Sequence, residues 1–174
     1  MKNWLVVTFI FLLVGCSSPQ ISDYQNTTPK LSLEDFFNGK LTAHGMVLDY
    51  NNKLTRRFTV AIDAHWQDNI GIIDERFTYN DGEIAFRKWQ IERLPDGSYE
   101  GKANDIIGTA IGRTSGSMLY WNYHMEIMVD GEPMEVFLDD WMYLIDDRHL
   151  LNKSTIMKYG IEVGEVFLSI EKSL

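Results

Sequence analysis

The side chains in this sequence best suited to chemistry are its carboxylates, and several of them are adjacent. Three such pairs are Asp74-Glu75, Asp139-Asp140 and Asp146-Asp147. Two carboxylates share acid–base work only when both point into one site, whereas adjacent residues of a β-strand point to opposite faces. No pair is therefore a catalytic pair by itself. Asp146-Asp147 follows an apolar run where the chain must turn, so we interpret it as part of a turn.

Other catalytic or metal-binding patterns are not found in the sequence. The histidines are scattered without the spacing of a metal cluster; they are His44, His65, His124 and His149. There is no Gly-x-Ser-x-Gly nucleophile motif, phosphate-binding loop or nucleotide-binding fingerprint. We therefore expect no metal and no cofactor, and we assign no catalytic residue. An enzyme that uses buried carboxylates is the least favoured of three interpretations.

The single cysteine, Cys16, lies at the end of a secretory signal. Lys2 supplies a positive charge, and residues 4–14 form an apolar run that is too short to span a membrane comfortably. The four residues Leu13-Val14-Gly15-Cys16 resemble the lipobox of bacterial lipoproteins, in which the cysteine is acylated and becomes the new N-terminus. This resemblance implies a lipoprotein signal peptide over residues 1–15.

Acylation would make Cys16 a membrane anchor. Two or more acyl chains, such as palmitate, at ~0.8 kcal/mol per buried CH₂, hold a protein more firmly than the marginal grip of one chain. Ser17 rather than Asp follows the cysteine. By resemblance to sorted lipoproteins, we expect the periplasmic face of the outer membrane. The alternative is an uncleaved anchor with an incidental cysteine.

The mature chain is acidic and of single-domain length. Removing residues 1–15 leaves 159 residues with 15 basic and 25 acidic side chains, a net charge of −10. This charge argues against nucleic acid as a partner and against electrostatic docking on anionic lipid. With Cys16 acylated, no disulfide is available, so the fold must be held together by packing.

Two short segments precede the main domain. Residues 16–30 are polar and contain two prolines, which predicts an acylated N-terminus followed by a flexible linker that spans roughly 20 Å as a coil. Ser32-Leu33-Glu34-Asp35 is a capping-box pattern, and Gly39 is placed to end a helix. We predict a short helix over residues 33–38, with an extended lead-in as the alternative.

From residue 41 onward the sequence alternates with a period of two. Turn signals such as Asn51-Asn52, Asp81-Gly82 and Asp130-Gly131 separate about ten strand-like runs, and no helical stretch interrupts them. Consecutive hairpins of this kind predict an all-β fold for residues 31–174. The favoured architecture is an antiparallel up-and-down barrel of about 8–10 strands, lipocalin-like, with a short N-terminal helix. A β-sandwich is the alternative.

Several segments resemble an uncharacterised proteobacterial lipoprotein family, known as the domain-of-unknown-function 3833 family. The most distinctive is LDDWMYLIDDRHLLNKS at 138–154, and the others are TRRFTV at 55–60, DERFTYNDGE at 74–83, RKWQI at 87–91 and ANDIIGTAIG at 103–112. The resemblance covers residues 24–172. It implies a lipoprotein with a barrel-like domain, often encoded beside fatty-acid-modifying enzymes, and supplies no activity or catalytic residues.

Hairpin register indicates which side chains face the interior. Residues 53–66 have one apolar face, ending at Trp66, on which Arg56 is the only charge. A two-residue turn at Asp68-Asn69 would place Glu75 and Phe77 on that same inner face of the next strand.

Two further hairpins extend the inner face. A two-residue turn at Asp81-Gly82 would pair Glu75 with Lys88 and Phe77 with Phe86, so that all four point inward. A two-residue turn at Asp130-Gly131 would pair Trp121 with Asp140 and place Met125 on the same apolar face. Four charged residues are therefore predicted to be interior, where each must be paired or hydrogen-bonded: Arg56, Glu75, Lys88 and Asp140.

These inner residues predict a ligand pocket in which the charges orient a polar head and the apolar side chains hold an apolar body. Its candidate residues are Arg56, Trp66, Glu75, Phe77, Phe86, Lys88, Trp121, Met125 and Asp140. The alternative is a barrel filled by side chains, with Glu75–Lys88 and Arg56–Asp140 as internal ion pairs. A β-bulge would also move a charge to the outer face.

The sequence thus favours an outer-membrane lipoprotein that binds or carries a fatty acid, a lipid or another apolar small molecule. The second interpretation is a filled barrel that acts as an envelope scaffold without a ligand. The sequence does not indicate which ligand or protein partner would be involved.

Overall fold

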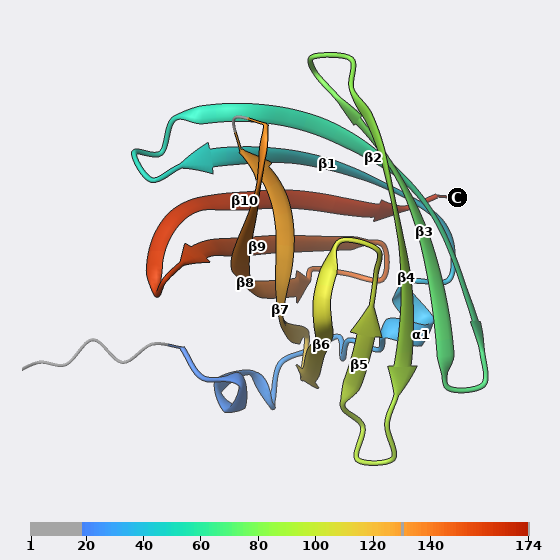
Figure 1. Cartoon of the computed structure of the whole chain (residues 1–174). Helices are drawn as coiled ribbons and strands as arrows, with labels where there is room; N and C mark the ends of the chain where they lie inside the picture. The colour runs from blue at the N-terminus through green and yellow to red at the C-terminus, as the bar shows by residue number, and fades with distance from the viewer. Residues whose placement is uncertain (1–18, 130, 174) are drawn as a thin grey trace, which may run out of the picture.

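Ten antiparallel strands form one closed barrel in the computed structural model, which describes residues 19–129 and 131–173 (Figure 1). Each strand pairs with its neighbours in sequence, and β1 pairs with β10 to close the ring. The predicted up-and-down barrel is confirmed, and the sandwich alternative is wrong. The strands are β1 Gly39–Asp49, β2 Leu54–Gln67, β3 Ile70–Tyr79, β4 Ile84–Arg93, β5 Tyr99–Lys102, β6 Ile106–Ser115, β7 Met118–Val129, β8 Glu132–Leu144, β9 His149–Lys158 and β10 Ile161–Lys172.

Alternation of apolar and polar residues gives the barrel its mainly apolar interior. In β2, Phe58, Val60, Ile62 and Ala64 are buried, while the residues between them are exposed. Side chains of a strand point alternately to its two faces, so this pattern directs one face of each strand to the barrel core. No helix among the described residues is long and apolar enough to cross a membrane.

The hairpins fall into two groups at opposite ends of the barrel. The β1–β2, β3–β4, β5–β6, β7–β8 and β9–β10 connections lie at one end, which we call the mouth, and they include the hairpins at the left and top of Figure 1. The other four connections share the opposite end with the helix α1, Leu33–Phe36. We call this the closed end, because α1 covers it.

The helix is tied to the closed end by its own apolar residues and by the strand ends around it. The Ser32 hydroxyl caps α1 by accepting a hydrogen bond from the Asp35 amide at 3.2 Å, as the capping-box pattern predicts. Leu33, Phe36 and Phe37 are buried. The helix ends two residues earlier than predicted, because the backbone of Phe37 leaves the helical conformation.

Polar contacts from three strands hold this plug in place. The Tyr99 hydroxyl donates to Glu34 Oε2 at 2.8 Å, and the Trp66 indole donates to the Phe37 carbonyl at 3.0 Å. Lys172 Nζ donates to the Asp35 carbonyl at 2.7 Å. The helix therefore closes the barrel through contacts with β2, β5 and β10.

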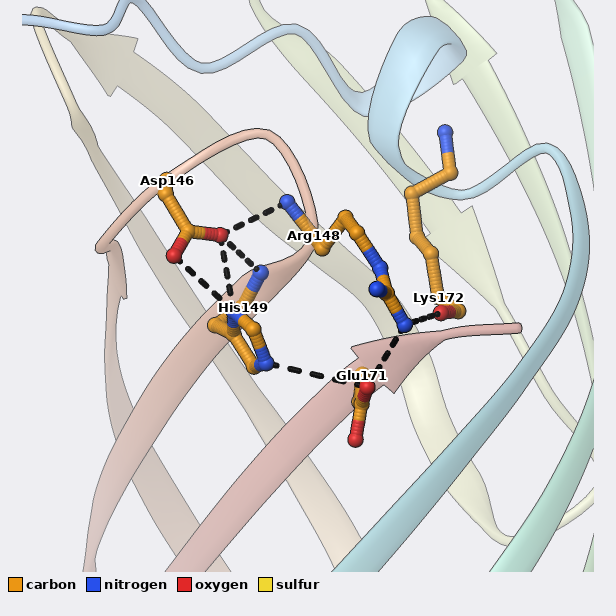
Figure 2. A network of polar contacts seen from close by, with 5 residues as sticks. All are labelled: Asp146, Arg148, His149, Glu171 and Lys172. Carbon is orange, nitrogen blue, oxygen red and sulfur yellow. Dashed lines mark hydrogen bonds and ion pairs between the residues drawn. The ribbon is translucent and has the colours of Figure 1, made fainter. Parts of the chain in front are cut away.

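The β8–β9 loop at the closed end is held by a second polar network (Figure 2). Asp146 Oδ1 accepts hydrogen bonds from the backbone amides of Arg148 and His149, both at 2.9 Å, so Asp146 has the turn role expected of it. Arg148 Nη2 donates to Glu171 at 2.7 Å and to the Lys172 carbonyl at 3.2 Å. The loop is thereby joined to the end of β10.

Part of the segment predicted as a flexible linker is packed on the barrel. The 3-10 helix η1, Ile21–Tyr24, brings the Tyr24 ring to 5.8 Å from the Tyr143 ring, centroid to centroid. The Thr27 hydroxyl accepts a hydrogen bond from the Ser117 amide at 2.8 Å. These contacts lie at the closed end and leave only the residues before Tyr24 available as a tether.

Two hairpins have the predicted register and one does not. Ile62 pairs with Glu75, and Trp121 pairs with Asp140, as the two-residue turns at 68–69 and 130–131 require. The β3–β4 hairpin instead has a three-residue loop, in which the Tyr79 amide donates to the Glu83 carbonyl at 3.0 Å. Glu75 therefore pairs with Arg87, and every residue of β4 is turned to the face opposite to the predicted one.

The large Trp121 side chain fits the interior only because glycine faces it. A Cβ atom added to Gly112, its partner on β6, would lie 2.0 Å from Cε3 of the indole. We predict that Gly112→Ala destabilises the protein by about 1–3 kcal/mol, as overpacking does in other cores. Thermal unfolding should show a lower Tm, whereas Arg113→Ala, at the next and exposed position, should leave it within a degree or two. An unchanged Tm for Gly112→Ala would contradict this packing.

Candidate ligand-binding site

The barrel interior contains a cavity of about 440 Å³. It extends from the closed end, where Leu33 and Phe37 line it, to the mouth, where Arg56 and Met128 do. Cavities of this size are in the range of small-molecule sites. Most of its lining is apolar and aromatic, and the charged exceptions lie on β2, β3, β4 and β8.

Glu75 and Arg87 bring opposite charges into the interior from the paired strands β3 and β4. Arg87 Nη1 lies 3.8 Å from Glu75 Oε2, and these side chains are 19% and 17% exposed. Arg87 also makes a fork-shaped contact with Asp105, in which Nη2 lies 2.7 Å from Oδ2 and Nε donates to Oδ1 at 3.0 Å. Burial opposes the charge of Arg87, but the attraction of Glu75, Tyr123 and Asp105 raises its pKa.

Asp140 provides a second buried carboxylate from β8. Asp140 is 3% exposed, and it pairs with Trp121 on β7 and with Ser154 on β9. Burial raises its pKa to about 6, although hydrogen bonds from Ser154 and Tyr123 oppose the increase. Burial also raises the pKa of the Tyr123 hydroxyl well above its usual value, with Asp140 adding to the effect.

The pKa of the Glu75 carboxyl is raised as well. Burial raises its pKa to about 7, Arg87 lowers it, and the negative charges of Asp105 and Asp140 raise it further. Glu75 and Asp140 lie on β3 and β8, which are five strands apart in either direction around the ring. The two carboxyls therefore approach the cavity from opposite walls.

Each of these carboxyls has one oxygen without a hydrogen bond from the described residues, although Glu75 Oε2 faces Arg87 Nη1 at 3.8 Å. Glu75 Oε2 and Asp140 Oδ1 are buried and accept no hydrogen bond from the described part of the chain. Both residues line the cavity. Buried polar atoms are nearly always hydrogen-bonded, so two unsatisfied acceptors in one cavity distinguish it from a simple packing defect.

Arg56 occupies the mouth of the cavity rather than its interior. Its guanidinium stacks on the Tyr79 ring at 3.4 Å, contacts Asp81 at 3.0 Å and forms an ion pair with Glu83. The pair with Asp140 considered from the sequence is not formed. Arg56 thus lines the cavity at its mouth, not in the interior as predicted, and is neutralised by the β3–β4 loop.

Six of the predicted pocket residues line the cavity, namely Arg56, Glu75, Phe77, Trp121, Met125 and Asp140. Phe86 and Lys88 do not, because the three-residue loop after Tyr79 places them on the outer wall. Phe86 is 66% exposed, and Lys88 forms an ion pair with Asp74 at 3.2 Å instead of with Glu75. Trp66 is partly buried but belongs to the closed end, where it contacts Tyr99 and Phe37.

The cavity is also lined by residues outside the predicted set, and two of them follow from the same shift. Arg87 and Trp89 of β4 face the cavity in place of Phe86 and Lys88, and Tyr123 of β7 joins them. The Trp89 ring meets those of Trp121 and Tyr123 edge-on, at 5.7 and 5.5 Å between centroids. Tyr123 stands between Trp121 and Met125 in the alternation of β7, so this residue could have been found from the sequence.

A family model described as a protein of unknown function (DUF3833) matches residues 10–172. The chain belongs to this family. No curated protein matches it. In the part of the chain that the structure describes, no group of three or more His, Cys, Asp or Glu side chains could hold a metal ion. The main feature of this DUF3833 barrel is its apolar cavity with the charged residues that line it.

The raised pKa of Glu75 makes stability depend on pH. The folded protein favours protonated Glu75, so this contribution is complete below a pH of about 4.5 and is lost as the pH rises through about 7. The shift corresponds to on the order of 3 kcal/mol. Glu75→Gln removes the titration, so its Tm should exceed that of the wild type at pH 8 and approach it at pH 4.5. Asp74→Asn, an equivalent change on the exposed outer wall, should show no such trend, and parallel pH profiles for Glu75→Gln and the wild type would disprove the prediction.

Proposed function

We propose that this protein binds an apolar small molecule or lipid inside its barrel while acyl chains on Cys16 hold it at the periplasmic face of the outer membrane. The observation that supports binding best is the cavity of about 440 Å³. A barrel filled completely by side chains, the alternative from the sequence, would leave no cavity of this size. Instead, space extends from the closed end to the mouth.

The composition of the lining fits an apolar ligand with a polar group. Aromatic and aliphatic side chains cover most of the wall, and Glu75, Arg87, Tyr123 and Asp140 supply polar atoms on the strands β3, β4, β7 and β8. Sites for small molecules usually have this combination of broad apolar surface and a few fixed polar groups. The mouth is bordered by exposed apolar residues, among them Tyr50, Met128 and Ile161, which an apolar ligand could contact on entry.

The anchoring part of the proposal rests on the sequence. Cys16 and the signal peptide lie outside the described residues. The leader anatomy and the Leu13-Val14-Gly15-Cys16 motif support acylation. The contacts of Tyr24 and Thr27 at the closed end add that the tether joins the barrel away from its mouth.

Filling the cavity should abolish binding without affecting the outer wall. Ile156 of β9 lines the cavity, whereas Leu151 of the same strand is 45% exposed. We predict that Ile156→Trp reduces the binding of an apolar fluorescent dye at least tenfold, because the indole occupies the space, and that Leu151→Trp does not. Both variants should be made in the protein without the Cys16 acyl chains, with thermal unfolding as the check on folding.

Extraction of the same purified protein with organic solvent, followed by mass spectrometry, should release a stoichiometric apolar molecule. Clean protein that binds no dye would instead favour a scaffold without a ligand. An extracted lipid that is chemically changed during incubation with the protein would indicate an enzyme.

The membrane anchor is tested separately. We predict that Cys16→Ser abolishes labelling with radioactive palmitate and moves the protein from the membrane fraction to the soluble fraction. A Ser17→Ala protein is the matched control and should still be labelled and sediment with membranes. A Cys16→Ser protein that still fractionates with membranes would contradict the proposed anchoring.

A further inference from the structure

The cations that line the cavity are already neutralised. Among the described residues of the lining, only Arg56 and Arg87 are basic. Arg87 is held by Asp105 on two sides and lies 3.8 Å from Glu75. Arg56 is held by Asp81 and Glu83 at the mouth. Neither guanidinium therefore offers an unshared charge to an anionic ligand.

Two carboxylate oxygens of the cavity, in contrast, lack a hydrogen bond from the described residues, and the 3.8 Å between Glu75 Oε2 and Arg87 Nη1 is too long for one. Glu75 Oε2 and Asp140 Oδ1 are buried and receive no hydrogen bond from the described residues, although both belong to the lining. Asp140 is 97% buried, since its exposed fraction is 3%. A buried acceptor left without a hydrogen bond destabilises the protein, and more so when it is charged. A ligand that donates hydrogen bonds to these two oxygens would remove this destabilisation.

We infer that the polar end of the ligand is a hydrogen-bond donor, an amine or a hydroxyl, rather than a carboxylate or a phosphate. This inference rests on the proposed binding function and specifies its ligand class. The donor would lie between β3 and β8, where the two carboxylates face the cavity from opposite walls. The apolar body would lie against aromatic side chains such as Phe77, Trp89 and Trp121.

The charge balance around the cavity favours an amine in particular. Two guanidiniums are accompanied by the carboxyls of Glu75, Asp140, Asp105, Asp81 and Glu83. Adding a ligand carboxylate would place a further negative charge among them, and like charges in a site of low dielectric repel strongly. A fatty acid, one of the ligands considered from the sequence, is therefore disfavoured by the geometry of this interior.

Three ligands with the same twelve-carbon chain test the head group directly. Dodecylamine, dodecanol and dodecanoate should compete with an apolar fluorescent dye for the Cys16→Ser protein at pH 8, where Glu75 and Asp140 are ionised and can only accept. The amine and the alcohol are expected to bind at least tenfold more tightly than dodecanoate. Tightest binding by dodecanoate, or equal binding by all three, would overturn the inference and leave the proposed function standing.

Substitutions test whether the carboxyls of Glu75 and Asp140 bind the head group. Asp140→Asn and Glu75→Gln should each weaken dodecylamine about tenfold and leave dye binding unchanged, which also shows that the cavity is intact. Asp74→Asn, on the exposed outer wall, should change neither. Unchanged amine binding in both cavity variants would contradict the inference. Loss of dye binding by the parent protein itself would instead refute the proposed function.

Discussion

The number of strands in the closed ladder determines what the interior of this barrel must contain. Barrel diameter grows with strand number, and eight strands enclose a space that side chains can just fill. Ten strands enclose a wider space. Because β1 pairs with β10 over nine residue pairs, the ring is closed and the sheet has no free edge. Large aromatic side chains occupy part of the space, with Gly101 and Gly112 facing Trp121. What remains is the cavity.

A wide interior also explains how charged side chains can be kept inside. The Arg87 guanidinium joins β3, β4 and the β5–β6 connection through Glu75 and Asp105. Without Arg87, two carboxyls would stand together in an apolar environment, which is strongly unfavourable. Asp140, on the far wall, has hydroxyl partners in Ser154 and Tyr123 but forms no ion pair with a Lys or Arg of the described residues. The polar cluster is therefore stable as a group but incompletely satisfied, and its unsatisfied oxygens face the cavity.

The sequence predicted the barrel, the short N-terminal helix and six of the residues that line the cavity, because these depend on alternation and on local turn signals. Turns 68–69 and 130–131 gave the correct register and placed Glu75 and Asp140 correctly. The β3–β4 turn failed because Asn80-Asp81-Gly82 is compatible with a two-residue and with a three-residue loop.

A contact outside the hairpin selects the longer of these two loops. Asn80 Oδ1 accepts from the Arg57 amide at 2.7 Å, and the Asn80 amide donates to the Arg57 carbonyl at 3.0 Å, so Asn80 is bound to β2 and cannot pair with β4. Such a contact between segments far apart in the sequence is not visible in local patterns. Because of this shift of one residue, Arg87 faces the cavity instead of Lys88. The ammonium group of a lysine is compact, whereas the planar guanidinium of an arginine can bind two carboxyls.

Under the proposed function, the position of the N-terminal segment would separate anchoring from ligand exchange. Tyr24 and Thr27 attach the N-terminal segment to β6–β8 at the closed end. Four residues, 17–20, separate Cys16 from η1, and they span at most about 14 Å when extended. Under the proposed anchoring, acyl chains in the membrane would restrain the closed end most directly. The mouth, with Arg56 and its exposed apolar border, lies at the other end and stays open to the surroundings. A carrier benefits from this arrangement, because its ligand can enter or leave without disturbing either the plug or the anchor.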